Sequence, residues 1–135
     1  MIGVLLVTHG NLGEALLAAA SHALGARPPR VACAGIGGSD DPDRMLAQLR
    51  ERVRALDDSS GVILLTDIFG ATPANLVARL LESDRVEGVA GVNLPMLLRV
   101  LSYRDATLAA AVGKALSGGV EGVLHISIDP CHGKR

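Results

Sequence analysis

The sequence predicts an α/β domain with a doubly wound, mostly parallel sheet that is covered by helices on both faces. Short apolar runs bounded by glycine alternate with longer segments of helical period, and this alternation is typical of parallel sheets. The runs at 2–7 and 61–66 are almost continuous Val, Ile and Leu, as in strands that never meet water. We expect five strands in the common order 2-1-3-4-5, at 2–7, 31–36, 61–66, 86–92 and 120–128.

Helix start signals lie between these runs. Asn11 with Glu14 resembles a capping box ahead of apolar residues at helical spacing. Asp41 before Pro42 predicts a capped second helix with proline in its first position. The pairs Thr72–Pro73 and Leu94–Pro95 repeat this signal. We therefore expect later helices near 73–82, 95–103 and 105–117.

Length and charge indicate one domain that does not bind nucleic acid. The chain has 135 residues, with 13 basic and 14 acidic side chains, so residues 1–135 suit a single domain. The near-neutral charge lacks the basic field that duplex binding needs. One Phe, one Tyr and no Trp leave no stacking platform for single strands.

The sequence predicts a cytoplasmic protein without membrane insertion. The longest apolar run, 15–20, is far shorter than the roughly 18 residues of a membrane span. No basic residue precedes Arg27, which argues against a secretory signal. Cys33 and Cys131 lie far apart without a CxxC motif, which favours a reducing compartment and no disulfide framework.

Two candidate catalytic residues, His9 and Asp67, directly follow the first and third predicted strands. In the expected order these strands are neighbours about 4.8 Å apart, at the edge where such sheets bind ligands. A carboxylate that accepts from one imidazole nitrogen fixes the tautomer and leaves the other nitrogen as an oriented nucleophile. This pair would suit holding a phosphoryl group on nitrogen.

Small residues near this pair predict a phosphate environment. Gly10, Gly70 and Ala71 have little or no side chain, so their backbone amides can approach an anion. A helix that begins near Thr72 adds its positive end and a hydroxyl group. We expect no metal or cofactor, because His125, Cys131 and His132 lack a fourth ligand.

A structural interpretation of the pair stays open at this point. A histidine beside a strand end is commonly a solvated or hydrogen-bonded loop residue, and Asp67 is also suited to capping a turn. Gly35, Gly37 and Gly38 follow the second strand without GxGxxG spacing, so they indicate a turn.

Three segments resemble enzyme IIA of the mannose-type phosphoenolpyruvate:sugar phosphotransferase system (PTS). They are GVLLVTHG at 3–10, TDIFGATP at 66–73 and AGVNLPML at 90–97. The resemblance implies a phosphotransferase in which His9 accepts a phosphoryl group from the phosphocarrier HPr and passes it to a histidine of a IIB subunit. It also implies that Asp67 hydrogen-bonds the active imidazole.

The resemblance further implies that Thr8 and Thr72 lie in the phosphate environment. It implies a homodimer in which the last strand, 120–128, is antiparallel and added to the partner's sheet. Two positions depart from the family pattern: Phe69 stands where Trp is frequent, and Ala71 replaces a common Gly.

Other functions remain as alternatives. A tetrapyrrole chelatase also has a His-Gly pair after its first strand, but it needs a roomy cleft. A binding module regulated by phosphorylation, without a transport role, fits the same residues. A related IIA-like subunit serves dihydroxyacetone phosphorylation, although the intact 67–73 loop favours the sugar-type branch. The sequence does not indicate which sugar such a system would transport.

Overall fold

The computed structural model describes residues 1–127, which fold around a parallel four-stranded sheet of order β2-β1-β3-β4. Its parallel pairing and strand order confirm the predicted fold class. The elements in chain order are β1 (Gly3–His9), α1 (Leu12–Leu24), β2 (Val31–Ile36), α2 (Pro42–Leu56), β3 (Val62–Thr66), α3 (Thr72–Ala78), β4 (Val86–Ala90), α4 (Leu94–Ser102) and α5 (Leu108–Glu121).

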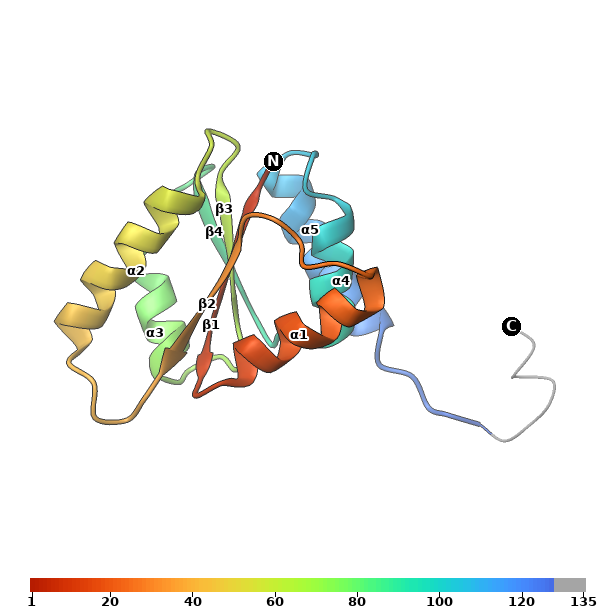
Figure 1. Cartoon of the computed structure of the whole chain (residues 1–135), viewed down its shortest axis with the longest axis horizontal. Coiled ribbons are helices and arrows are strands. Elements are labelled where there is room, and N and C mark those ends of the chain that lie inside the picture. Colours follow the sequence, from red (N-terminus) through yellow and green to blue (C-terminus); the bar gives the residue numbers. More distant parts are fainter. Residues whose placement is uncertain (128–135) are drawn as a thin grey trace.

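Helices cover both faces of the sheet. Figure 1 shows α2 and α3 on one side and α1, α4 and α5 on the other. Two separate apolar cores result, one on each face. None of the helices within residues 1–127 combines the length and apolarity that a membrane crossing requires.

The two central strands are buried on both faces, as their apolar runs predict. Every residue from 4 to 7 in β1 and from 62 to 65 in β3 is inaccessible to solvent. The strands pair with Val7 opposite Thr66, so the residues that follow emerge side by side at the carboxyl edge of the sheet. That edge carries the candidate site.

The predicted cap at the start of α2 is confirmed, and the one predicted at the start of α1 is wrong. The Asp41 carboxylate accepts the Asp43 amide and caps α2, with Pro42 in the first turn, as predicted. The expected capping box at Asn11 is wrong, because the Asn11 side chain makes no capping bond. Instead the Thr8 hydroxyl accepts the Gly13 amide at 2.8 Å and fixes the first turn of α1.

The single chain described here forms no strand at 120–127, so the predicted exchange of a last strand, 120–128, in a dimer stays a prediction. Helix α5 continues to Glu121, and residues 123–127 form neither strand nor helix; residue 128 lies outside the described residues. Glycines near the end of α5 allow this helix to approach α4 closely. A Cβ at Gly118 would lie 2.9 Å from the Arg99 Cβ, and one at Gly122 would lie 2.2 Å from the Pro95 Cβ.

Candidate active site

The structure brings His9 and Asp67 together at the carboxyl edge of the sheet. His9 is the last residue of β1, and Asp67 directly follows β3. The His9 Nδ1 lies 2.8 Å from the Asp67 Oδ2, and the His9 backbone N–H donates to the same oxygen at 3.1 Å. One carboxylate oxygen therefore holds both the ring and the strand end.

The two side chains differ in exposure and in charge. The His9 side chain is 53% exposed and that of Asp67 only 11%. Burial raises the pKa of Asp67, but hydrogen bonds from the ring and backbone of His9 outweigh it and leave this pKa below its usual value. An ionised carboxylate makes Nδ1 the donor, so Nε2 carries the free lone pair on an open ring.

The loop after Asp67 has backbone amides that are free to bind an anion. Gly70 has a φ of +87°, a left-handed conformation that glycine adopts without strain. The amides of Gly70, Ala71 and Thr72 have no hydrogen-bond partner within residues 1–127. Thr72 begins α3 and is exposed. Of the predicted phosphate-environment residues, these three have backbone amides that are free to bind an anion.

Thr8 and Gly10, two further predicted phosphate-environment residues, make hydrogen bonds within the fold. Thr8 is fully buried, and its hydroxyl is engaged with the Gly13 amide. The Gly10 amide donates to the Ile36 carbonyl at 3.1 Å. Through these hydrogen bonds both residues help to position the segment around His9.

Asn93, at the amino end of α4, has a structural role. Its Oδ1 accepts the Met96 amide at 2.9 Å, and its Nδ2 donates to the Gly119 carbonyl at 3.1 Å. The side chain thus caps α4 and ties it to α5.

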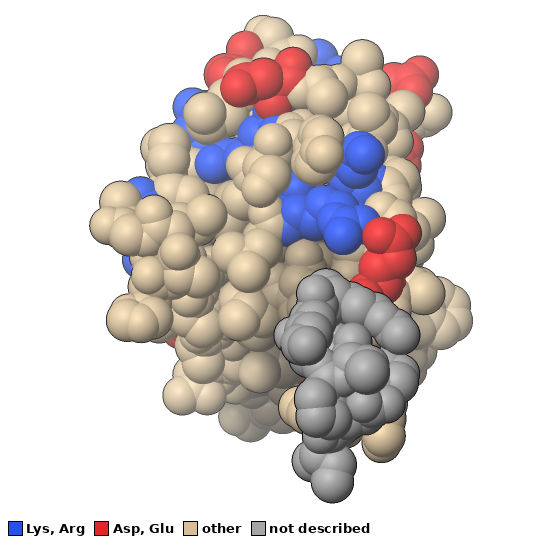
Figure 2. Space-filling model, turned by 90° about the vertical axis from the view of Figure 1, so that its right-hand side faces the viewer, with Lys and Arg blue, Asp and Glu red and all other residues tan. Residues whose placement is uncertain are grey.

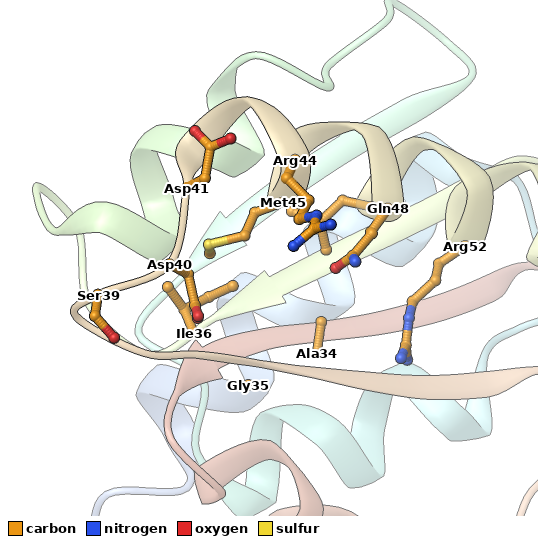
Figure 3. Close-up of a pocket in the computed structure, with 11 residues that line it drawn as sticks. Ala34, Gly35, Ile36, Ser39, Asp40, Asp41, Arg44, Met45, Gln48 and Arg52 are labelled. Atoms are coloured by element: carbon orange, nitrogen blue, oxygen red, sulfur yellow. The ribbon is translucent and has the colours of Figure 1, made fainter.

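His9 is on an open surface and lines none of the five principal cavities found within residues 1–127. The largest, about 480 Å³, lies between β2 and α2. In Figure 3, Arg44 and Gln48 reach from α2 toward the strand segment that contains Ala34 and Gly35. This cavity borders the edge strand, so it supplies no cleft at the imidazole.

No cluster of metal-ligating side chains is present within the described part of the chain. Residues 1–127 contain no group of three or more His, Cys, Asp or Glu side chains suited to one ion. Of the three residues weighed as metal ligands, His125 is exposed, while Cys131 and His132 lie outside the described residues.

Sequence reasoning missed one feature of this edge. Ile68 and Phe69 are 56% and 87% exposed, directly after Asp67, and Leu12 at the start of α1 is 41% exposed. The signal was present as apolar residues inside a loop rich in small residues, but burial cannot be read from the sequence.

Comparisons with known proteins decide the family. A family described as the "PTS system fructose IIA component" matches residues 3–116. The chain belongs to this family. Its members are components of the sugar phosphotransferase system, which agrees with the resemblance noted from the three sequence segments and disfavours a chelatase.

Two named proteins of the PTS are similar in sequence to this chain. The mannose-specific EIIAB component of Escherichia coli (strain K12) is 30% identical over 132 residues, 96% of this chain but only 41% of that protein. The fructose-specific EIIA component of Bacillus subtilis (strain 168) is 32% identical over 106 residues, 78% of this chain and 72% of that protein. The chain therefore spans less than half of the first relative.

A solved PTS structure has the same fold. The mannose/sorbose specific IIA subunit from Enterococcus faecalis superposes with a TM-score of 0.83, over 94% of this chain and 96% of that chain. At 20% identity this likeness supports the arrangement of strands and helices alone.

Proposed function

We propose that this protein is a phosphohistidine carrier of the PTS, in which His9 accepts a phosphoryl group from phosphorylated HPr and passes it to a histidine of a IIB subunit. One observation carries the proposal: the exposed His9 ring is held through Nδ1 by the buried Asp67 carboxylate at 2.8 Å. Nε2 is then the nucleophile, oriented before the donor arrives.

The transfer needs positioning and charge balance more than covalent chemistry. The Nε2–P bond forms as the N–P bond of the donor breaks, and the donor imidazole leaves with its own electron pair. The His9 ring keeps its Nδ1 proton and becomes cationic, and the Asp67 carboxylate stabilises that charge. The free amides of Gly70, Ala71 and Thr72 bind the phosphoryl oxygens.

Phosphorylation of His9 also suits a second candidate function, which is regulation of another protein. A phosphorylated His9 would alter the charge of an exposed surface, and this change suits a regulatory module that binds another protein without sugar transport. Membership of the PTS family favours a role in sugar transport. The exposed His9 ring is compatible with both transport and regulation. We further propose that residues 1–135 form a single cytoplasmic IIA domain.

We also propose a homodimer in which the segment after α5 extends the partner's sheet. Within residues 1–127, β3 is the only strand paired with β4, and Val86 at the start of β4 also forms an isolated bridge with Glu82. An apolar groove of about 120 Å³ runs beside Gly88, Val89 and Ala90. Val123, Leu124 and Ile126 are 72–90% exposed. An added strand would bury these side chains and pair the free edge of β4.

Phosphorylation of the purified protein tests the carrier function. Incubation with enzyme I, HPr and phosphoenolpyruvate should add one acid-labile, base-stable phosphoryl group, which mass mapping places on His9. His9→Ala should abolish the labelling. His22 and His125 are also exposed, so His22→Ala and His125→Ala are matched controls that should be labelled fully. Labelling that persists in His9→Ala would exclude this site.

A further inference from the structure

The largest of the five principal cavities within residues 1–127 lies away from His9 and has no part in the proposed transfer. Its volume is about 480 Å³, and it lies between the outer edge of β2 and α2. Cavities of roughly 300–1,000 Å³ are typical of small-molecule binding sites. The buried side chains of Ile36, Met45 and Leu49 give this cavity an apolar lining, and polar side chains of α2 form one of its walls (Figure 3).

Two arginines and a glutamine form this polar wall. Arg44, Gln48 and Arg52 follow one another at intervals of four residues, so they share one face of α2. In Figure 3 all three side chains extend from α2 toward β2. Within the described part of the chain, Arg44 and Gln48 make no hydrogen bond, and neither arginine is ion-paired. Guanidinium groups without a carboxylate partner suit the binding of an oxyanion.

The backbone of the edge strand β2 supplies the opposite wall. The carbonyls of Arg30 and Ile36 accept amides of the β1 segment, so the odd-numbered residues between them direct their backbone groups outward. The Cys33 carbonyl accordingly accepts Arg52 Nη1. Gly35, which lines the cavity, therefore presents an N–H and a carbonyl on the free edge of the sheet.

The cavity suits a small molecule better than an added strand. A strand that pairs with β2 needs a continuous row of outward backbone groups. Arg52 interrupts that row, because it occupies the Cys33 carbonyl. The guanidinium group has five N–H donors, so Arg52 can bind an anion while it keeps this hydrogen bond.

Two acidic residues at one end of the cavity limit where an anion can lie. Asp40 and Asp41 line this end, in the loop before α2. Their carboxylates already accept backbone amides of Gly37 and Asp43. Their negative charge repels an oxyanion, so the anionic part of a ligand lies along the wall that carries the arginines.

We propose that this cavity binds a small hydroxylated oxyanion, a sugar phosphate or a sugar acid. Its anionic group contacts Arg44 and Arg52, and its hydroxyl groups contact Gln48 and the backbone of Gly35. A hydroxyl group both donates and accepts, as do the glutamine amide and the strand edge. Binding requires no phosphoryl group on His9, so the inference is independent of the proposed carrier function.

Isothermal titration calorimetry of the unphosphorylated full chain tests the site. The probes are fructose 1-phosphate, glucose 6-phosphate and gluconate, and their separate halves are represented by glucose and inorganic phosphate. We expect at least one of the three organic anions to bind one to one with a Kd below about 1 mM. The gluconate arm distinguishes a carboxylate from a phosphate ligand.

Glucose and inorganic phosphate should each bind at least about tenfold more weakly, because each offers only part of the contacts. No binding by any of the three organic anions would overturn the proposal. Inorganic phosphate that binds as tightly as the organic anions would overturn the assignment of a hydroxylated ligand.

Arg44→Gln tests the polar wall. The loss of charge-assisted hydrogen bonds should raise the Kd about tenfold or more. Because Arg44 is exposed and makes no hydrogen bond within residues 1–127, the fold should be retained. Arg54→Gln is the matched control: Arg54 is exposed on the same helix, but it pairs with Glu51 and lines a different cavity. Its Kd should equal that of the wild type, and equal weakening in both variants would contradict a specific site.

The amide of Gly35 shows where the ligand binds. In the ¹H–¹⁵N spectrum of the labelled protein, this amide signal should shift during the titration with the Kd found by calorimetry. The amide of Gly113, an exposed glycine in α5, should not shift. Binding without a shift at Gly35 would place the ligand elsewhere and overturn the inference, while HPr labelling of His9 would still decide the carrier function separately.

Discussion

A single carboxylate oxygen organises the candidate site. Asp67 Oδ2 accepts both Nδ1 and the backbone N–H of His9, so it fixes the ring rotamer relative to the strand that carries it. The pKa of Asp67 is lowered because these hydrogen bonds outweigh the opposing effect of burial. Its stabilising contribution is therefore full above the unfolded pKa, near 3.9, and is lost as the pH falls through the folded value.

Removing this carboxylate should slow phosphoryl transfer without preventing it. In Asp67→Ala the ring loses its orientation and its counter-charge, so we expect a single-turnover rate about tenfold to a thousandfold lower. Rapid-quench measurement with phosphorylated HPr gives this rate.

Asp40→Ala is the matched control, because Asp40 lies in the loop after β2 and its carboxylate also accepts a backbone amide, that of Gly37. Its transfer rate should remain close to that of the wild type. An unchanged rate in Asp67→Ala would remove this residue from the mechanism.

Among the elements, the strands of the sheet could be predicted and the end of the chain could not. The unbroken apolar runs predict β1 and β3, because a strand that is covered on both faces has no solvent-facing polar positions. The helix expected at 105–117 was placed too short, because α5 includes Gly118 and Gly119. In the fold these glycines lie inside α5, where a Cβ on either would press against Arg99 or Met96 of α4. The sequence alone does not distinguish a glycine that ends a helix from a glycine inside a helix that allows another helix to pack closely.

The contact between α4 and α5 also depends on Asn93. Asn93→Ala removes the acceptor for the Met96 amide and the donor to the Gly119 carbonyl. We expect the free energy of unfolding to fall by about 1–2 kcal/mol, measured by urea denaturation.

Asn75→Ala provides the control, because Asn75 is exposed within α3 and its side chain makes no hydrogen bond in the described part of the chain. It should change stability by less than about 0.5 kcal/mol. Equal effects of the two substitutions would show that the Asn93 cap adds nothing.

At the scale of the whole molecule, charge is dispersed and apolar surface gathers near the free sheet edge and the end of α5. Figure 2 shows basic and acidic side chains on the upper part of the side where α4 and α5 lie, with mostly uncharged residues below them where no grey atoms cover the view. Leu116 and Val120 of α5 are exposed, as are the apolar residues that follow the helix. A partner that covers this surface would remove it from water.

The proposed homodimer is testable with one substitution in the segment after α5. Leu124 is 80% exposed, and Leu124→Asp would place a charge in the proposed intersubunit sheet. We expect the wild type to sediment as a dimer at micromolar concentration and Leu124→Asp to sediment as a monomer.

His125→Asp adds a similar charge at the adjacent position, which points to the opposite face of an extended strand. It should leave the dimer largely intact. A monomeric wild type in analytical ultracentrifugation would contradict the proposed exchange.

As with the fold, part of the candidate site could be predicted from the sequence. The placement of His9 and Asp67 follows from strand order, because the carboxyl ends of adjacent parallel strands share one edge. The roles of Thr8 and Gly10 do not follow from it, since the choice between binding an anion and bonding Gly13 or Ile36 is made by the tertiary structure.

The reactive ring is attached to a strand whose preceding residues, Val4 to Val7, are wholly sealed from solvent between two strands and two helical layers. Amide protons in such a strand exchange with deuterium only when the entire fold opens. In the proposed carrier function, the phosphorylated ring is thus attached to the least yielding part of the backbone.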